Sequence, residues 1–314
     1  MAEDNSALMT LVARMYYLDG LGQSEIAQIY GVSRSKVSRL ITEARHRGIV
    51  RISVDEYDPR HYGLEQKLVA RFGLRHVVVV RNMPGAEENL RRTVGYFAAS
   101  EAAEWIRQAT TVGIAGGRTL GALIQAMEAQ PPASGPAVLQ LMGTIGASPS
   151  SIDASELCRM LAMRFHGVVQ TISAPALVED GRVREMFLSH RQIRSVWRSF
   201  SSLDLAFVGI GTLDESVFVV RDVFEPAELK QLRSVGAVGE ICGRFFDARG
   251  RECESPFRER VISIDLDVLR QCGDVVGVTT GRKRAAAIRA SISGKLINGL
   301  IIDEIGARAV LEEV

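Results

Sequence analysis

Apolar residues recur at helical spacing in three short segments of the first fifty residues. From Ala7 to Leu18 they repeat every three or four positions, and Asp19-Gly20 ends the run. A second helix is predicted to start at Ser24 as its N-cap and to end at Gly31, where glycine permits a left-handed turn. Ser33 is expected to cap a third helix. Two helices joined by so short a turn predict a helix-turn-helix.

The third predicted helix has one apolar and one polar, basic face. Val37, Leu40, Ile41 and Ala44 share a stripe, which leaves Ser35, Ser38, Arg39 and Thr42 on the other side. Residues 34–51 hold six Lys or Arg and one acidic residue, whereas the whole chain has 38 Lys and Arg, 37 Asp and Glu, and a net charge of +1. A solvated basic helix is the simpler interpretation, but the ordered turn and stripe favour a helix that binds double-stranded DNA.

Such a helix enters the major groove, where arginine reads guanine and hydroxyls adapt to several base edges. Ser35 and Arg39 are therefore predicted to contact bases, and Gln23, Arg34 and Lys36 to contact phosphates. The complete predicted DNA-binding set is Gln23, Ser33, Arg34, Ser35, Lys36, Ser38, Arg39 and Thr42.

A strand and a linker are predicted after this region. "IVRISV" after Gly48 alternates apolar and polar residues, as the wing of a winged helix does. "DEYDPRHYG" is polar and shows neither helical nor strand periodicity. The predicted domains are a DNA-binding domain at 1–54, a linker at 55–63 and a larger domain at 64–314.

The larger domain alternates short apolar strands with helical stretches, which predicts an α/β, Rossmann-like fold with a mostly parallel sheet covered on both faces. Helices are expected through Leu64–Phe72, over Asn89–Gln108 and from Thr119. Strands are expected at 76–80, 111–115, 137–141, 168–172, 203–208, 261–264, 275–278 and 300–302.

Glycine-rich segments follow four of these strands, namely "GIAGGRTL" at 113–120, "LMGTIG" at 141–146, "VGIGT" at 208–212 and "VGVTTGRK" at 276–283. Ligands on such folds bind outside the carboxyl ends of the strands, and glycines let backbone N–H groups approach an anion closely. Arg118, Thr119 and Lys283 add donors suited to phosphate. Each loop alone is compatible with plain turn geometry, but together the four favour a phosphate or polyol site.

Composition narrows the function further. The four cysteines are scattered without the spacing of a metal site, so reduced thiols, no metal and no cofactor are expected. No apolar run has the length of a membrane span, and "MAEDNSALMT" lacks the features of a signal peptide. The cytoplasm is the expected location.

The chain resembles the SorC family of sugar-responsive regulators over nearly its whole length. The resemblance is carried by "QSEIAQIYGVSRSKVSRLITEARHRGIVRI", "GEICGRFFDARG" and "TTGRKRAAAIRASISGKLINGLIIDEIGARAVLE". It implies an effector domain related in fold to glucosamine-6-phosphate deaminase and ribose-5-phosphate isomerase, which binds a sugar, polyol or phosphosugar and forms homodimers or homotetramers.

The resemblance also implies the effector-binding residues, among which the first four carry most weight. The family often has a bulkier residue where this chain has Gly116, which implies a pocket of different shape. The set is Gly116, Gly117, Arg118, Thr119, Gly143, Thr144, Gly211, Thr212, Glu240, Lys283 and Asp303.

Two other functions compete with a ligand-controlled regulator. A sugar-phosphate isomerase or deaminase with an attached helix-turn-helix would need a poised acid and base. The five histidines are dispersed, and Asp303 with Glu304 equally suits a helix start, so no catalytic residue is predicted. A constitutive DNA-binding protein whose second domain only oligomerises would not need four glycine loops.

Overall fold

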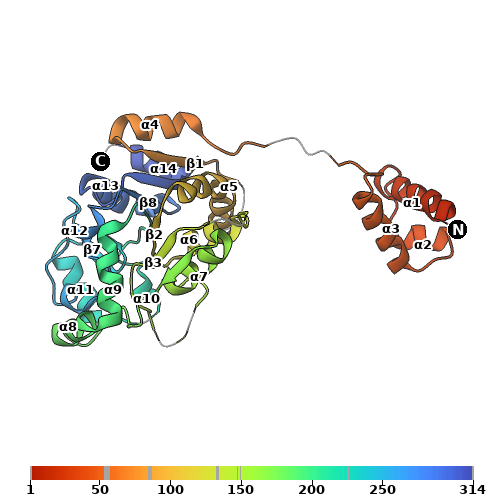
Figure 1. The fold of residues 1–314 in the computed structure, drawn as a ribbon. Coiled ribbons are helices and arrows are strands. Elements are labelled where there is room, and N and C mark those ends of the chain that lie inside the picture. Colours follow the sequence, from red (N-terminus) through yellow and green to blue (C-terminus); the bar gives the residue numbers. More distant parts are fainter. Residues whose placement is uncertain are drawn as a thin grey trace. The chain divides into compact units, whose positions relative to one another are not determined.

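The computed structural model describes residues 2–52, 57–83, 87–131, 134–146, 148, 150–221, 223–224 and 226–312. The chain divides into two units, Met1–Asp58 and Pro59–Val314, which are described separately (Figure 1). Among the described residues, no helix has both the length and the apolar character needed to cross a bilayer.

The smaller unit is a three-helix unit made of α1 (Ala2–Tyr17), α2 (Gln23–Ile29) and α3 (Arg34–His46). The predicted apolar stripe of α3 is confirmed, since all four of its side chains are buried against α1 and α2. Ser33 is confirmed as a cap because its hydroxyl accepts the N–H of Lys36 at 3.2 Å. Gly31 has the expected positive φ, +62°. The helix-turn-helix geometry therefore follows from local signals.

Two predictions in this unit are wrong. The N-cap of α2 is Gly22 rather than Ser24, because the Gly22 N–H donates to the Glu25 carboxylate at 2.7 Å and the helix starts at Gln23. Residues 49–52 form no strand, since the Val50 N–H caps α3 by donating to the Ala44 carbonyl at 3.1 Å. The remainder of the predicted wing, residues 53 and 54, lies outside the described residues.

The larger unit is built on a parallel sheet of seven strands within the described part of the chain, in the order β1-β9-β8-β5-β2-β3-β4. A separate antiparallel hairpin pairs β6 with β7. The strands are β1 (His76–Val80), β2 (Thr111–Ile114), β3 (Ala137–Gln140), β4 (Val168–Gln170), β5 (Leu205–Gly209), β6 (Gly239–Ile241), β7 (Arg244–Phe246), β8 (Asp274–Val278) and β9 (Gly299–Asp303).

Helices cover the sheet in two groups that can be followed in Figure 1. Successive contacts join α5, α6 and α7 in one group and α4, α14 and α13 in the other. The helices are α4 (Tyr62–Phe72), α5 (Glu87–Gln108), α6 (Arg118–Ala126), α7 (Ala154–Phe165), α8 (Gly181–Ser189), α9 (Arg191–Ser199), α10 (Val217–Val220), α11 (Pro226–Ser234), α12 (Leu266–Leu269), α13 (Ala285–Ser293) and α14 (Glu304–Leu311), with 3-10 turns η1 (Phe200–Ser202), η2 (Arg258–Arg260) and η3 (Arg282–Arg284).

The direction of the strand order changes between β2 and β5. From β2 the chain continues through β3 to β4 on one side, and from β5 it continues through β8 and β9 on the other. The loops after β2 and β5 therefore diverge and leave a crevice at the carboxyl ends of these strands, where α/β proteins bind their ligands. The α/β prediction with a covered parallel sheet is confirmed.

The predicted strand at 261–264 is wrong. All four residues are buried, which is why their apolar pattern is typical of a strand. They form only single bridges, Val261 with Leu177 and Ser263 with Met142, and join no sheet. The β6–β7 hairpin was not predicted at all. Its two-residue turn places Cys242 at φ +52° and Gly243 at φ +74°.

The larger unit begins with residues that pair along the free edge of β1. The Arg81 N–H donates to the Pro59 carbonyl, and the His61 N–H donates to the Val79 carbonyl, both at 2.7 Å. Arg60 forms ion pairs with Glu65 at 2.9 Å and with Glu101 at 3.0 Å. Residues 59–63, which the sequence places in the linker, are thus part of the larger unit.

Candidate effector cavity and DNA-binding helix

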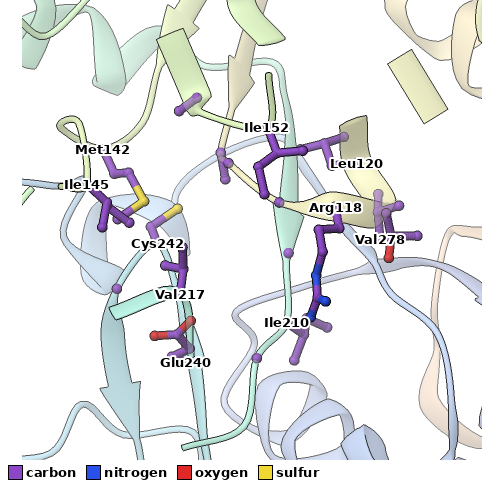
Figure 2. Close-up of a pocket in the computed structure, with 18 of the residues that line it drawn as sticks. Arg118, Leu120, Met142, Ile145, Ile152, Ile210, Val217, Glu240, Cys242 and Val278 are labelled. Atoms are coloured by element: carbon purple, nitrogen blue, oxygen red, sulfur yellow. The ribbon is translucent and has the colours of Figure 1, made fainter. Parts of the chain in front are cut away.

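A cavity of about 160 Å³ lies in the crevice at the carboxyl ends of the sheet. Its walls come from the loops after β2, β3, β5 and β8, together with α10 and the turn of the β6–β7 hairpin. Figure 2 shows Arg118, Leu120 and Ile152 on one side, and Glu240, Val217 and Cys242 on another. The four glycine loops singled out in the sequence therefore meet at one place.

The start of α6 forms the polar wall of the cavity. Gly117 has φ +145°, which side chains rarely allow, and its N–H donates to the Ile152 carbonyl at 3.0 Å. A Cβ on Gly116 would lie 3.1 Å from the same carbonyl oxygen. The next N–H groups, those of Arg118, Thr119 and Leu120, belong to the first helical turn and have no acceptor within the helix. This helix start is suited to bind an anion.

Glu240 is a buried acidic group on the opposite wall. Its side chain is buried and accepts hydrogen bonds from the Ser216 hydroxyl, at 2.7 Å, and from the Val217 N–H. Burial raises the pKa of Glu240 to about 7, although both hydrogen bonds act in the opposite direction. The adjacent thiol, Cys242, has its pKa raised by burial to about 12 and stays protonated. Glu240 can accept a hydrogen bond from a ligand hydroxyl.

Four arginines line the cavity, and three of them have a carboxylate partner. Arg91 pairs with Glu88 at 3.0 Å, Arg221 pairs with Asp153 at 2.6 Å, and Arg284 pairs with Glu215. Arg118 forms no ion pair within the described part of the chain, and its side chain is exposed.

Seven of the predicted effector residues line the cavity, and four do not. Those that do are Gly116, Gly117, Arg118, Thr119, Gly143, Gly211 and Glu240.

The other four lie outside the lining. Thr144 pairs with Pro175, and Thr212 is half-buried just beyond Gly211. The Lys283 side chain is 83% exposed and lies 3.8 Å from Glu215. The buried Asp303 carboxylate accepts the N–H of Gly281, at 2.5 Å, and that of Gly306, at 3.1 Å. It thus joins the loop after β8 to the start of α14.

Sequence reasoning missed several polar lining residues. Arg91, Asp153, Glu215, Arg221 and Arg284 all line the cavity. In this region the sequence indicated Lys283 as the donor, but 3-10 geometry in η3 turns Arg284 inward and leaves Lys283 outside. The segments around Arg91, Asp153, Glu215 and Arg221 contain no local pattern that would indicate a ligand site. No group of three or more metal-ligating side chains occurs in the described ranges.

The outer face of α3 is open and largely unpaired. Arg34, Ser35, Lys36, Arg39 and Thr42 are exposed, while Ser38 and Gln23 are half-buried. The Thr42 hydroxyl donates to the Ser38 carbonyl at 3.1 Å, and the hydroxyls of Ser33 and Ser35 lie 3.0 Å apart. Within the described residues, no carboxylate pairs with Arg34, Lys36 or Arg39. These cations are available for phosphates and bases.

A helix-turn-helix unit joined to an α/β unit with a central cavity defines a DNA-binding transcriptional regulator with an effector domain. Residues 60–312 match the family described as "Putative sugar-binding domain", and residues 9–47 match "Sigma-70, region 4". The chain belongs to the sugar-binding family and is a member of the SorC family of transcriptional regulators, not an enzyme.

Curated relatives are similar over nearly the whole chain. A deoxyribonucleoside regulator of Bacillus subtilis (strain 168) is 28% identical and covers 100% of both chains. The transcriptional regulator LsrR of Enterobacter sp. (strain 638) is 30% identical over 97% of this chain and 92% of its own. The sorbitol operon regulator of Klebsiella pneumoniae is 25% identical over 98% of this chain and 99% of its own.

Solved structures share the fold. The full-length sorbitol operon regulator SorC from Klebsiella pneumoniae superposes with a TM-score of 0.78 at 25% identity, covering 98% of each chain. A DeoR family transcriptional regulator from Listeria monocytogenes gives 0.73 at 25% identity, over 79% of this chain and 98% of the other.

Proposed function

We propose that this regulator controls carbohydrate-related genes and that a small phosphorylated sugar or polyol, bound in the cavity, changes its affinity for operator DNA. The observation that carries the proposal is the start of α6, where N–H groups without an acceptor in the helix, and Arg118, which has no ion-pair partner among the described residues, line a cavity at the switch point of the sheet. The relatives' names, which mention sorbitol and deoxyribonucleosides, support this class of effector.

On the DNA side, α3 lies in the major groove. Arg39 and Ser35 contact base edges together with Ser38 and Thr42, whereas Gln23, Ser33, Arg34 and Lys36 hold the phosphate backbone. The open outer face of α3 supports this assignment. The protein works in the cytoplasm as a homodimer or homotetramer, because paired recognition helices read the two half-sites of an operator.

The test is operator binding with and without effectors. An operator is first selected from random duplexes by the full-length protein. Fluorescence anisotropy then measures its Kd in the presence of free and phosphorylated pentoses, hexoses and polyols. We expect a phosphorylated compound to change the Kd about 5- to 150-fold, the range of ordinary allosteric coupling. Failure to select any operator, or a Kd that no compound changes, would contradict the proposal.

A further inference from the structure

Helix α9, green in Figure 1, presents a row of three arginines to solvent. Arg191, Arg194 and Arg198 are exposed, and at 3.6 residues per turn they fall within one sector of about 60° around the helix axis. On the other side of the helix, Ile193 and Val196 are buried in the core of the larger unit. The fold therefore holds the row in place on the surface of this unit.

The arginines of this row lack the acidic neighbours that other helices supply. In α7 and α14, the exposed Arg159 and Arg308 pair with Glu156 at 3.2 Å and with Glu304 at 2.7 Å, one turn away. Helix α9 contains no acidic residue, and no carboxylate of the described residues forms an ion pair with its arginines. The row is thus open to an anion from outside the chain.

The surrounding segment is positive and exposes little apolar surface. Residues 181–199 contain five arginines and one glutamate, a net charge of +4, whereas the whole chain has +1. Of these arginines, Arg184 pairs with Asp265 at 3.4 Å. Met186 is the single large apolar side chain that is exposed in this segment, all of which the structure describes. Protein interfaces have an apolar core, and a two-fold contact through this face would bring the same arginines of two copies together.

The backbone of double-stranded DNA has the charge and the spacing that suit the row. Arg191 and Arg198 are seven positions apart, which is about 10.5 Å along the helix axis. DNA has one phosphate per about 1.7 Å of its axis, so about six phosphates lie within that length. Arginine binds phosphate through paired N–H donors. The chain from Arg47 to Pro59 spans at most about 40 Å, so the larger unit stays close to any duplex that α3 binds.

We propose that the outer face of α9 is a second DNA-binding surface, on which Arg191, Arg194 and Arg198 bind phosphates of the duplex that flanks the operator. Phosphate contacts carry no base sequence, so this surface adds affinity and leaves the choice of operator to α3. The inference goes beyond the proposed function, in which α3 binds the DNA and the larger unit binds the effector.

The test measures how DNA binding by the full-length protein depends on salt and on flanking DNA. The selected operator is prepared as a minimal duplex and as a duplex extended by about 20 base pairs of arbitrary sequence on each side. Fluorescence anisotropy gives the Kd for each at salt concentrations from about 50 to 200 mM, a range over which phosphate contacts change affinity strongly.

The variant that tests the row is the triple substitution Arg191→Gln, Arg194→Gln and Arg198→Gln, which removes three charges and keeps good helix formers on an exposed face. On the extended duplex, we expect the slope of log affinity against log salt to become shallower by about 2.7, since each phosphate contact contributes about 0.9. Affinity for the extended duplex at low salt should fall tenfold or more. Wild type and variant should bind the minimal duplex equally.

A matched control removes the same charge from another part of the larger unit. Arg249, Arg251 and Lys295 are exposed in the segments that follow β7 and α13. The triple substitution Arg249→Gln, Arg251→Gln and Lys295→Gln should keep the wild-type slope and Kd on both duplexes.

Each contrary outcome has a distinct meaning. If the α9 variant keeps the wild-type slope on the extended duplex, or if the control lowers the slope as much, the inference is wrong, because α9 then makes no phosphate contact or net charge alone decides. Light scattering determines the oligomeric state, and a smaller assembly for the α9 variant would overturn the inference by identifying this face as a contact between copies. Failure of the wild type to bind the minimal duplex would count against the proposed function instead.

Discussion

The buried carboxyl of Glu240 should make the stability of the larger unit depend on pH. Its pKa is about 7 in the folded protein, against an ordinary value of 4.5. Below pH 4.5 both the folded and the unfolded chain carry the proton, and burial of the neutral acid has no charge penalty. As pH rises through about 7 the folded state must also ionise, so this stabilising contribution is lost. Each pKa unit corresponds to about 1.4 kcal/mol, which gives a loss of about 3 kcal/mol.

Glu240→Gln removes this dependence, since the amide is the neutral counterpart of the protonated acid. The difference in unfolding free energy, variant minus wild type, should therefore increase by about 3 kcal/mol between pH 4.5 and pH 8. Groups that titrate equally in both proteins cancel in this difference.

Denaturant unfolding followed by tryptophan fluorescence measures the effect in the full-length chain. Both tryptophans, Trp105 and Trp197, lie in the larger unit, so the signal does not report on the helix-turn-helix. Ser216→Ala serves as a second variant, because loss of the Ser216 hydrogen bond should raise the pKa of Glu240 further and steepen the wild-type trend. A stability difference that stays constant from pH 4.5 to pH 8 would refute the reasoning.

Four further substitutions test other parts of the molecule. Arg39→Ala should weaken operator binding by about 1–3 kcal/mol and affect random DNA less, as measured by anisotropy; equal losses on both would exclude base reading. Arg118→Ala should abolish the effector response and spare operator binding, and a normal response at the same effector concentration would remove Arg118 from the site. Gly117→Ala should cost about 1–3 kcal/mol in thermal unfolding, because its φ of +145° strains any side chain; an unchanged Tm would contradict this. Asp303→Ala should cost a similar amount, about 1–3 kcal/mol, by leaving the buried Gly306 N–H and the half-buried Gly281 N–H without an acceptor; unaltered calorimetric stability would show that these two hydrogen bonds are dispensable.

Local signals made the helix-turn-helix predictable. Ser33, Gly31 and the apolar stripe of α3 act within a few residues of each other, so their geometry can be derived from spacing alone. The strands of the main sheet were also predictable, because strands covered on both faces are almost entirely apolar. Whether a buried apolar segment joins a sheet depends on residues far from it in the sequence. This explains the wrong strand prediction at 261–264.

The cavity was predictable in position but not in its charges. Glycines after β2, β3, β5 and β8 indicate where the backbone approaches a ligand. Arg221 and Asp153, by contrast, lie 68 positions apart and meet only in the folded chain. The sequence also cannot show that the Asp303 carboxylate already accepts hydrogen bonds from backbone N–H groups, because these partners depend on how the loop after β8 meets α14.

The pairing of residues 59–61 with β1 determines where the chain can be cut. A fragment that begins at Leu64, the boundary suggested by the sequence, would lose Arg60 and leave the buried Glu65 without its ion-pair partner. It would also expose the outer edge of β1, the kind of open strand edge through which chains aggregate. A fragment that begins at Pro59 keeps both, and is the better starting point for crystallising the effector domain by itself.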